Sequence, residues 1–169
     1  MKTTNIYYIL DCSHKMQGGK LSSMSQNILK VARALKFANN KTNLHIITYR
    51  DRAKITSPFE RFSAFGNPNL GEGLKALESA IRYQRKIDNE QTRSIFILHA
   101  SDNVLQGWNK PLERLFNLRE FAFGHRYVVQ YGTPDKYAKQ AFTRFTDSNE
   151  KILPYFSESR LCSLVRHTK

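Results

Sequence analysis

The sequence predicts an α/β fold with a doubly wound, mostly parallel central sheet and helices on both of its faces. Two observations support this prediction. Short apolar runs alternate along the chain with segments in which apolar residues recur every three or four positions. The run SIFILHA, residues 94–100, is apolar almost throughout, as in a strand buried on both faces of a parallel sheet. No linker, repeat or low-complexity segment interrupts the pattern, so we expect a single domain over residues 1–169.

The first half of the chain predicts three strands and two helices. Residues 5–12 (NIYYILDC) form the first strand, and residues 42–50 and 53–59 form two strands joined by a tight turn at 50–52. The first helix has one apolar face, made by Met24, Ile28, Val31 and Leu35. The second helix repeats this pattern with Leu70, Leu74, Leu77 and Ile81. Asn69 stands directly before it, where an N-cap is expected.

The second half continues the alternation. After the strand at 94–100 we expect a helix from Pro111 to Phe121, a strand at 125–132 and a helix that opens with Thr133, Pro134 and Asp135. Residues 151–156 (KILPYF) predict a short edge strand, because Pro154 cannot donate to a sheet neighbour. The chain is then expected to end in a helix over residues 157–167.

Composition indicates a soluble protein rather than a membrane protein. Hydrophobic residues make up 40% of the 169 residues and charged residues 24%. No run approaches the roughly 18 apolar residues of a membrane-spanning helix. The two cysteines, Cys12 and Cys162, are too few for a disulfide scaffold. We therefore expect a reduced, cytoplasmic setting and no membrane association.

The charge of the chain predicts an anionic partner. Lysine and arginine number 27 against 14 aspartate and glutamate, a formal net charge of +13. The basic residues are spread along the chain in short runs, such as residues 49–54 and 82–86, without a long basic tract. We therefore expect an acidic protein surface as the partner, with nucleic acid as the less favoured alternative.

Three loops are expected to meet at one end of the sheet. In doubly wound sheets, ligands bind outside the carboxyl ends of the strands. The loops that reach this place are residues 11–19, residues 66–69 and residues 101–103. Polar side chains occur in all three, so this end of the sheet is the expected binding site.

The same loops resemble those of the von Willebrand factor type A (vWA) domain, a Rossmann-like fold. ILDCSHKM, residues 9–16, has the spacing of the family's LDxSxSM, and residues 66–81 match its GGTxLGxAL stretch. The resemblance implies a metal-ion-dependent adhesion site (MIDAS), built in the family from Asp-x-Ser-x-Ser, a threonine and an aspartate. Within the family, the chain looks most like the small bacterial TerY-like proteins of tellurite-resistance and stress gene clusters.

Three of the five ligand positions depart from the family pattern. Asp11 and Ser13 match, whereas Lys15, Pro68 and Ala100 occupy the other three positions, and Asp102 is displaced by two residues. A divalent ion such as Mg²⁺ needs about six oxygen ligands and is repelled by an ammonium. We therefore expect a degenerate, metal-free site in which Lys15 replaces the metal beside Asp11. The expected site residues are Asp11, Ser13, Lys15, Asn67, Asn69 and Asp102.

Two other interpretations of this site stay open. In the first, Lys15 points to solvent and Asp11 only caps a backbone turn. In the second, Mg²⁺ or Mn²⁺ binds after all, through Asp11, Ser13, Asn69 and Asp102, and the chain is a metal-dependent adhesion module.

The sequence does not predict an enzyme. It holds no GxSxG, P-loop or GxGxxG motif, and its five histidines lack metal-ligand spacing. His99, on a buried strand, is expected to be a hydrogen-bonded core residue. Phe65 and Trp108 are candidate docking residues, because large aromatics dominate interfaces; a Trp108 that caps the next helix is the alternative.

We therefore predict a non-catalytic protein-interaction module without a cofactor. The family resemblance implies an adaptor role in bacterial stress or phospho-signalling, beside a kinase or phosphatase of the same gene cluster. A basic nucleic-acid-binding protein is the alternative from a different functional class.

Overall fold

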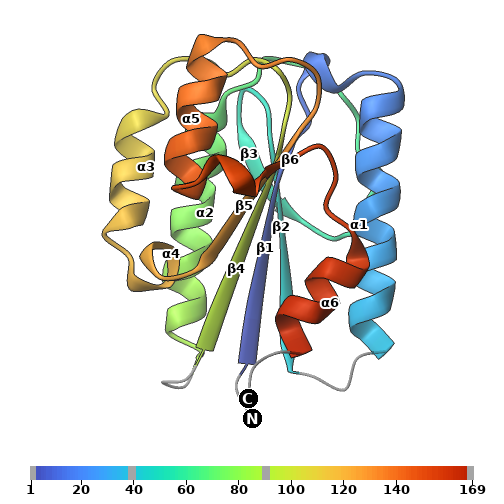
Figure 1. The fold of residues 1–169 in the computed structure, drawn as a ribbon, viewed down its shortest axis with the longest axis vertical. Helices are drawn as coiled ribbons and strands as arrows, with labels where there is room; N and C mark the ends of the chain where they lie inside the picture. The colour runs from blue at the N-terminus through green and yellow to red at the C-terminus, as the bar shows by residue number, and fades with distance from the viewer. Residues whose placement is uncertain (1–2, 38–40, 89–91, 167–169) are drawn as a thin grey trace.

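A six-stranded sheet forms the centre of the molecule in the computed structural model, which describes residues 3–37, 41–88 and 92–166 (Figure 1). The strand order is β3-β2-β1-β4-β5-β6. All neighbours are parallel except β2 and β3, which are antiparallel. The strands are β1 Thr3–Asp11, β2 Thr42–Tyr49, β3 Ala53–Thr56, β4 Thr92–Ala100, β5 His125–Gln130 and β6 Ile152–Leu153. The predicted fold class is confirmed.

Helices cover both faces of the sheet (Figure 1). One face packs against α1 (Gly19–Phe37) and α6 (Glu158–Arg166). The other packs against α2 Leu70–Arg85, α3 Asn109–Phe116, α4 Arg119–Ala122 and α5 Lys136–Thr146. The apolar stripes predicted for α1 and α2 are buried in these two cores. Among the described helices, none combines the length and apolarity needed to cross a membrane.

Two predicted elements differ in length from those observed. The expected helix from Pro111 to Phe121 is two helices, α3 and α4, because Leu118 adopts an extended conformation between them. The expected strand at 151–156 keeps only Ile152–Leu153, preceded by the 3₁₀ turn η2, Asn149–Lys151. Its edge position is confirmed, and Pro154 follows directly after its last residue, where a donor would be needed to continue pairing.

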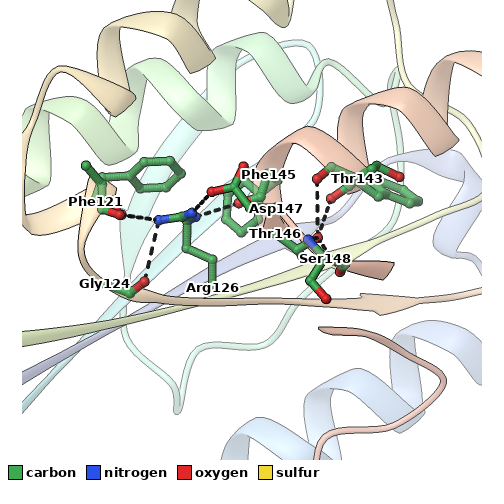
Figure 2. A network of polar contacts seen from close by, with 10 residues as sticks. Phe121, Gly124, Arg126, Thr143, Phe145, Thr146, Asp147 and Ser148 are labelled. Carbon is green, nitrogen blue, oxygen red and sulfur yellow. Dashed lines mark hydrogen bonds and ion pairs between the residues drawn. The ribbon is translucent and has the colours of Figure 1, made fainter. Parts of the chain in front are cut away.

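A buried arginine holds helix ends together at the α2–α5 face (Figure 2). Arg126 of β5 donates from Nε to the carbonyl of Phe145, at 2.7 Å, and from Nη1 to that of Phe121, at 2.6 Å. It also forms an ion pair with Asp147, the left-handed residue that ends α5. Carbonyls at helix ends lack intrahelical donors, so Arg126 bonds the Phe145 carbonyl and adds a second donor to that of Phe121, which also accepts the Gly124 N–H.

Strand register brings the ends of β1 and β4 together. β1 pairs with β2 on one side and β4 on the other, so the strand order reverses at β1 and β4. Leu10 lies opposite His99, which places Asp11 and the residues after Ala100 at the same end of the sheet. This is the switch point at which doubly wound folds bind ligands.

Candidate functional site

The carboxylate of Asp11 is the centre of the site. Asp11 is the last residue of β1 and 0% of it is exposed. One carboxylate oxygen accepts the backbone N–H of Ser13 at 2.8 Å, and the other accepts the N–H of Ser101 at 3.1 Å. The hydroxyl of Ser101 donates a further, short hydrogen bond to the second oxygen. Both oxygens of this buried anion are therefore bonded by neutral donors.

Ser101 is the residue that sequence reasoning missed. It follows β4 directly, is fully buried, and contacts Asp11 across the β1–β4 pair. The motif alignment places the family's third-loop aspartate at Ala100, with Asp102 two residues further on, and gives no role to Ser101 between them. A serine directly after a buried strand, at the switch point of the sheet, is the sequence signal that would have found it.

The predicted contact between Lys15 and Asp11 is wrong. Lys15 is exposed in the 3₁₀ turn η1, His14–Met16, and the described chain shows no ion pair between its ammonium and Asp11. Its backbone carbonyl accepts the ammonium of Lys20 at 3.4 Å. The site thus matches the alternative in which Lys15 points to solvent and Asp11 bonds a backbone turn. Hydrogen bonds from Ser13 and Ser101 replace the expected ammonium.

Asp51 fixes the second loop. The side-chain amide of Asn67 donates to Asp51 at 2.8 Å, so this predicted site residue is engaged away from Asp11. Gly66 has φ +74°, and a Cβ there would lie 2.2 Å from a carboxylate oxygen of Asp51. The carbonyl of Gly66 accepts both the backbone N–H of His14, at 2.9 Å, and its ring N–H, at 2.7 Å. The loop is therefore anchored to the first loop by backbone and histidine contacts.

Asn69 and Asp102 are not brought together with Asp11. Asn69 accepts the N–H of Glu72 and caps α2, as predicted. Asp102 lies against the loop after β5: one of its oxygens is 3.3 Å from the position that a Cβ on Gly132 would take. Of the four side chains proposed as an alternative metal set, Asp11 and Asn69 are engaged by separate backbone donors, whereas Ser13 Oγ and Asp102 Oδ1 are buried without a partner in the described chain.

We tested whether the residues fit the divalent ion that the family resemblance implies. Ser13 Oγ is buried and unpaired in the described chain, as a ligand oxygen would be. The oxygens of Asp11 are already bonded, and Pro68 offers no side-chain ligand. No group of three or more His, Cys, Asp or Glu side chains in the described part of the chain has an arrangement that could hold a metal. A divalent ion needs about six oxygens, so these residues do not fit one.

The two predicted docking aromatics have opposite environments. Phe65 is 54% exposed, and the guanidinium of Arg50 stacks on its ring at 3.7 Å from the centroid. Trp108 is only 4% exposed; it occupies the N-cap position of α3 and packs into the α2–α5 core. The prediction of Trp108 as a docking anchor is therefore wrong, and its alternative, a Trp that caps the helix, is the observed one.

Burial makes two potentially reactive side chains of this region, the thiol of Cys12 and the imidazole of His99, unreactive at neutral pH. Loss of solvation raises the pKa of the Cys12 thiol to about 12, which leaves little thiolate at neutral pH. Burial lowers the pKa of His99 to about 3, and its Nδ1 is hydrogen-bonded to the hydroxyl of Tyr131 at 2.8 Å. His99 is thus the hydrogen-bonded core residue that was predicted.

Comparison with known families identifies the fold family. The sequence model of the von Willebrand factor type A domain matches residues 5–106, more than half of the chain. The chain belongs to this family. The matched region includes most of β1, the whole of β2, β3 and β4, and all three loops of the vWA site described above. A comparison with curated protein sequences found no significant match.

Solved structures of the same architecture come from the mussel byssus. Proximal thread matrix protein 1 in one crystal form has a TM-score of 0.61 at 14% identity. The same protein, described as having a zinc-occupied MIDAS motif, has a TM-score of 0.66 at 16% identity. In both comparisons 97% of this chain is covered but only 44% of the mussel protein, so the chain spans less than half of its length. At this identity the likeness concerns the fold.

Proposed function

We propose that this vWA domain is a non-catalytic protein-interaction module that binds an acidic partner without a metal. The observation that supports it is the exposed Lys15 at the rim of a site whose buried Asp11 is already bonded by Ser13 and Ser101. A metal at such a site would attract a partner's carboxylate. Here the ammonium of Lys15 is free to pair with that carboxylate directly.

The surroundings of Lys15 suit such a partner. Phe65 and the stacked Arg50 offer an aromatic surface with a cation, the combination that dominates many interfaces. The nearby Asp51 is engaged by Asn67. The two cations Lys15 and Arg50 outnumber this one carboxylate, so the rim can attract an acidic partner and raise its encounter rate.

The TerY-like resemblance gives this proposal its biological setting. We propose an adaptor in bacterial stress or phospho-signalling, with a kinase or phosphatase as partner and a cytoplasmic location. The absence of a recognised catalytic motif, together with the buried Cys12 and His99, supports a non-enzymatic role. A metal-dependent adhesion module is the alternative, which the free hydroxyl of Ser13 favours.

A bead-displayed peptide library with a fixed Asp or Glu tests the proposal. We expect the chain to enrich acidic peptides equally in EDTA and in millimolar Mg²⁺. Lys15→Glu is expected to abolish the enrichment and Lys15→Ser to weaken it at least tenfold, about 1.4 kcal/mol, as for loss of a charge-assisted contact. Lys139→Glu, at an exposed residue of α5, is the matched control.

Two results would contradict this function. Loss of peptide binding in EDTA, with one-site Mg²⁺ or Mn²⁺ binding by calorimetry, would establish the metal-dependent alternative. Unchanged binding by both Lys15 variants would show that the rim of the Asp11 site is not the docking surface.

A further inference from the structure

Positive charge is concentrated in the first part of the chain. No acidic residue occurs between Asp11 and Asp51. The same segment contains seven basic residues: Lys15, Lys20, Lys30, Arg33, Lys36, Lys41 and Arg50. Most of it forms α1 and β2, and α1 itself carries four basic residues and no acidic one.

The two helical layers use their charges differently. In the layer formed by α2, α3, α4 and α5, ion pairs link neighbouring helices. Arg85 of α2 pairs with Glu120 of α4, and Arg114 of α3 pairs with Glu78 of α2. Among the described residues, none of the ion pairs involves α1 or α6. Five of the nine lysine and arginine residues on α2 to α5 are therefore paired with a carboxylate, whereas the described cations of α1 and α6 are not.

The exposed side chains of α1, among those that the structure describes, are polar. They are Ser22, Ser23, Gln26, Lys30, Arg33 and Lys36. α6 lies beside it and adds the exposed Arg160 and Arg166 (Figure 1). Of the described large apolar side chains that are strongly exposed, none lies on either helix. Exposed Phe59 lies across a pocket from Leu21 and Leu29, in the first part of α1 and away from Lys30, Arg33 and Lys36 in sequence.

We infer that the α1–α6 face binds the phosphate backbone of nucleic acid. Lys, Arg, Ser and Gln side chains are the groups that contact phosphates without reading sequence. Protein interfaces are built around aromatic and apolar residues, and membrane-surface helices need an apolar face. The described surface around Lys30, Arg33 and Lys36 has no strongly exposed apolar residue on α1, which favours a phosphodiester backbone over an acidic protein or a lipid surface.

The spacing of the cations suits this ligand. Lys30, Arg33 and Lys36 follow one another along about 9 Å of helix axis, at 1.5 Å per residue. One nucleic-acid strand carries a phosphate about every 3.4 Å along its axis, so the three side chains face about three consecutive phosphates. With one arginine of α6 the face contacts about four phosphates, and binding should weaken about a hundredfold between 50 and 200 mM salt.

A pair of charge-matched variants tests the inference. In the first variant Lys30, Arg33 and Lys36 become Gln, a good helix former, and in the second Lys110, Lys136 and Lys139 become Gln. All six residues are exposed, so both variants should fold and both lose three positive charges. Binding is measured by fluorescence anisotropy with a labelled DNA duplex and a labelled single-stranded RNA at several salt concentrations.

The α1 variant should bind both probes more than tenfold more weakly, with a salt slope smaller by about 2 to 3. The second variant should lose less than threefold. Equal losses in both variants would overturn the inference, because net charge alone would then explain the binding. Equally tight binding of polyglutamate, or of anionic lipid vesicles, to the same face would also overturn it. Lys15→Glu leaves α1 intact, so failure of the acidic-partner proposal would not affect this result.

Discussion

Two charged side chains are buried in different parts of the fold, one in β5 and one at the end of β1, and they are stabilised in different ways. Arg126, 5% exposed, donates to backbone carbonyls and also forms an ion pair with Asp147. Asp11, 0% exposed, accepts from neutral groups among the described residues: the N–H groups of Ser13 and Ser101 and the Ser101 hydroxyl. Burial lowers the pKa of Arg126, and the Asp147 carboxylate opposes this effect.

The difference separates a structural charge from one at a binding site. Arg126 lies against the rings of Phe116 and Phe121, and it joins the ends of α4 and α5. Around Asp11, by contrast, the hydroxyl of Ser13 is buried and unpaired in the described chain. A buried polar atom without a partner is costly, and such atoms cluster where function, rather than stability, sets the residue.

Replacing Arg126 should have the largest effect on stability. In Arg126→Leu the carbonyls of Ala122 and Phe145 lose the Arg126 donor, and that of Phe121 keeps only the Gly124 N–H. At about 1–3 kcal/mol for each unsatisfied carbonyl, we expect the free energy of unfolding to fall by about 3 kcal/mol or more. Urea unfolding followed by circular dichroism measures this, and Arg126→Lys should lose less. Wild-type stability in the leucine variant would mean that water reaches these carbonyls.

Changes at Asp11 should have a smaller effect. In Asp11→Asn an amide N–H₂ replaces one acceptor and faces a backbone donor, which should cost about 1–3 kcal/mol. Ser101→Ala removes only the hydroxyl donor and should cost about 1 kcal/mol. Thermal unfolding with and without Mg²⁺ measures both. A more stable Asp11→Asn variant would show that the buried negative charge opposes folding and is retained for binding.

Asp147 should contribute least. It is 61% exposed, so solvent screens its ion pair with Arg126. Asp147→Asn keeps a residue that tolerates the observed φ of 57° and should reduce the free energy of unfolding by less than about 1 kcal/mol. The effect should shrink further in high salt, as the unfolding midpoint would show. A loss as large as that of Arg126→Leu would place the stabilisation in the ion pair instead of the carbonyl bonds.

Local patterns in the sequence were sufficient for most of the fold. The stripe from Met24 to Leu35 predicts the buried face of α1, and Asn69 predicts the N-cap of α2. These features depend on neighbours within a few residues, where periodicity and capping act. The break at Leu118 was not predictable in this way, since the apolar pattern continues through it.

The site was less predictable because its contacts join distant segments. Ser101 is 90 residues from Asp11, and only the β1–β4 register brings them together. The direction of Lys15 depends on a 3₁₀ turn whose cap has no side-chain hydrogen bond, so no short motif marks it. The burial of Trp108 follows from how α3 packs against its neighbours, which residue type alone does not determine.

The arrangement of β1 and α6 has a practical consequence for attachment. The carbonyl of Leu164 accepts Arg93 at 2.5 Å, and Arg93 lies opposite Thr4 in the sheet, so the end of α6 lies beside the start of β1. Asp11 lies at the other end of that strand, about 26 Å away at 3.3 Å per residue. A fluorophore, bead or surface coupled next to Thr3 or Arg166 would therefore hold the molecule by its far end. The Asp11 loops would face outward, whichever of the two attachment points is used.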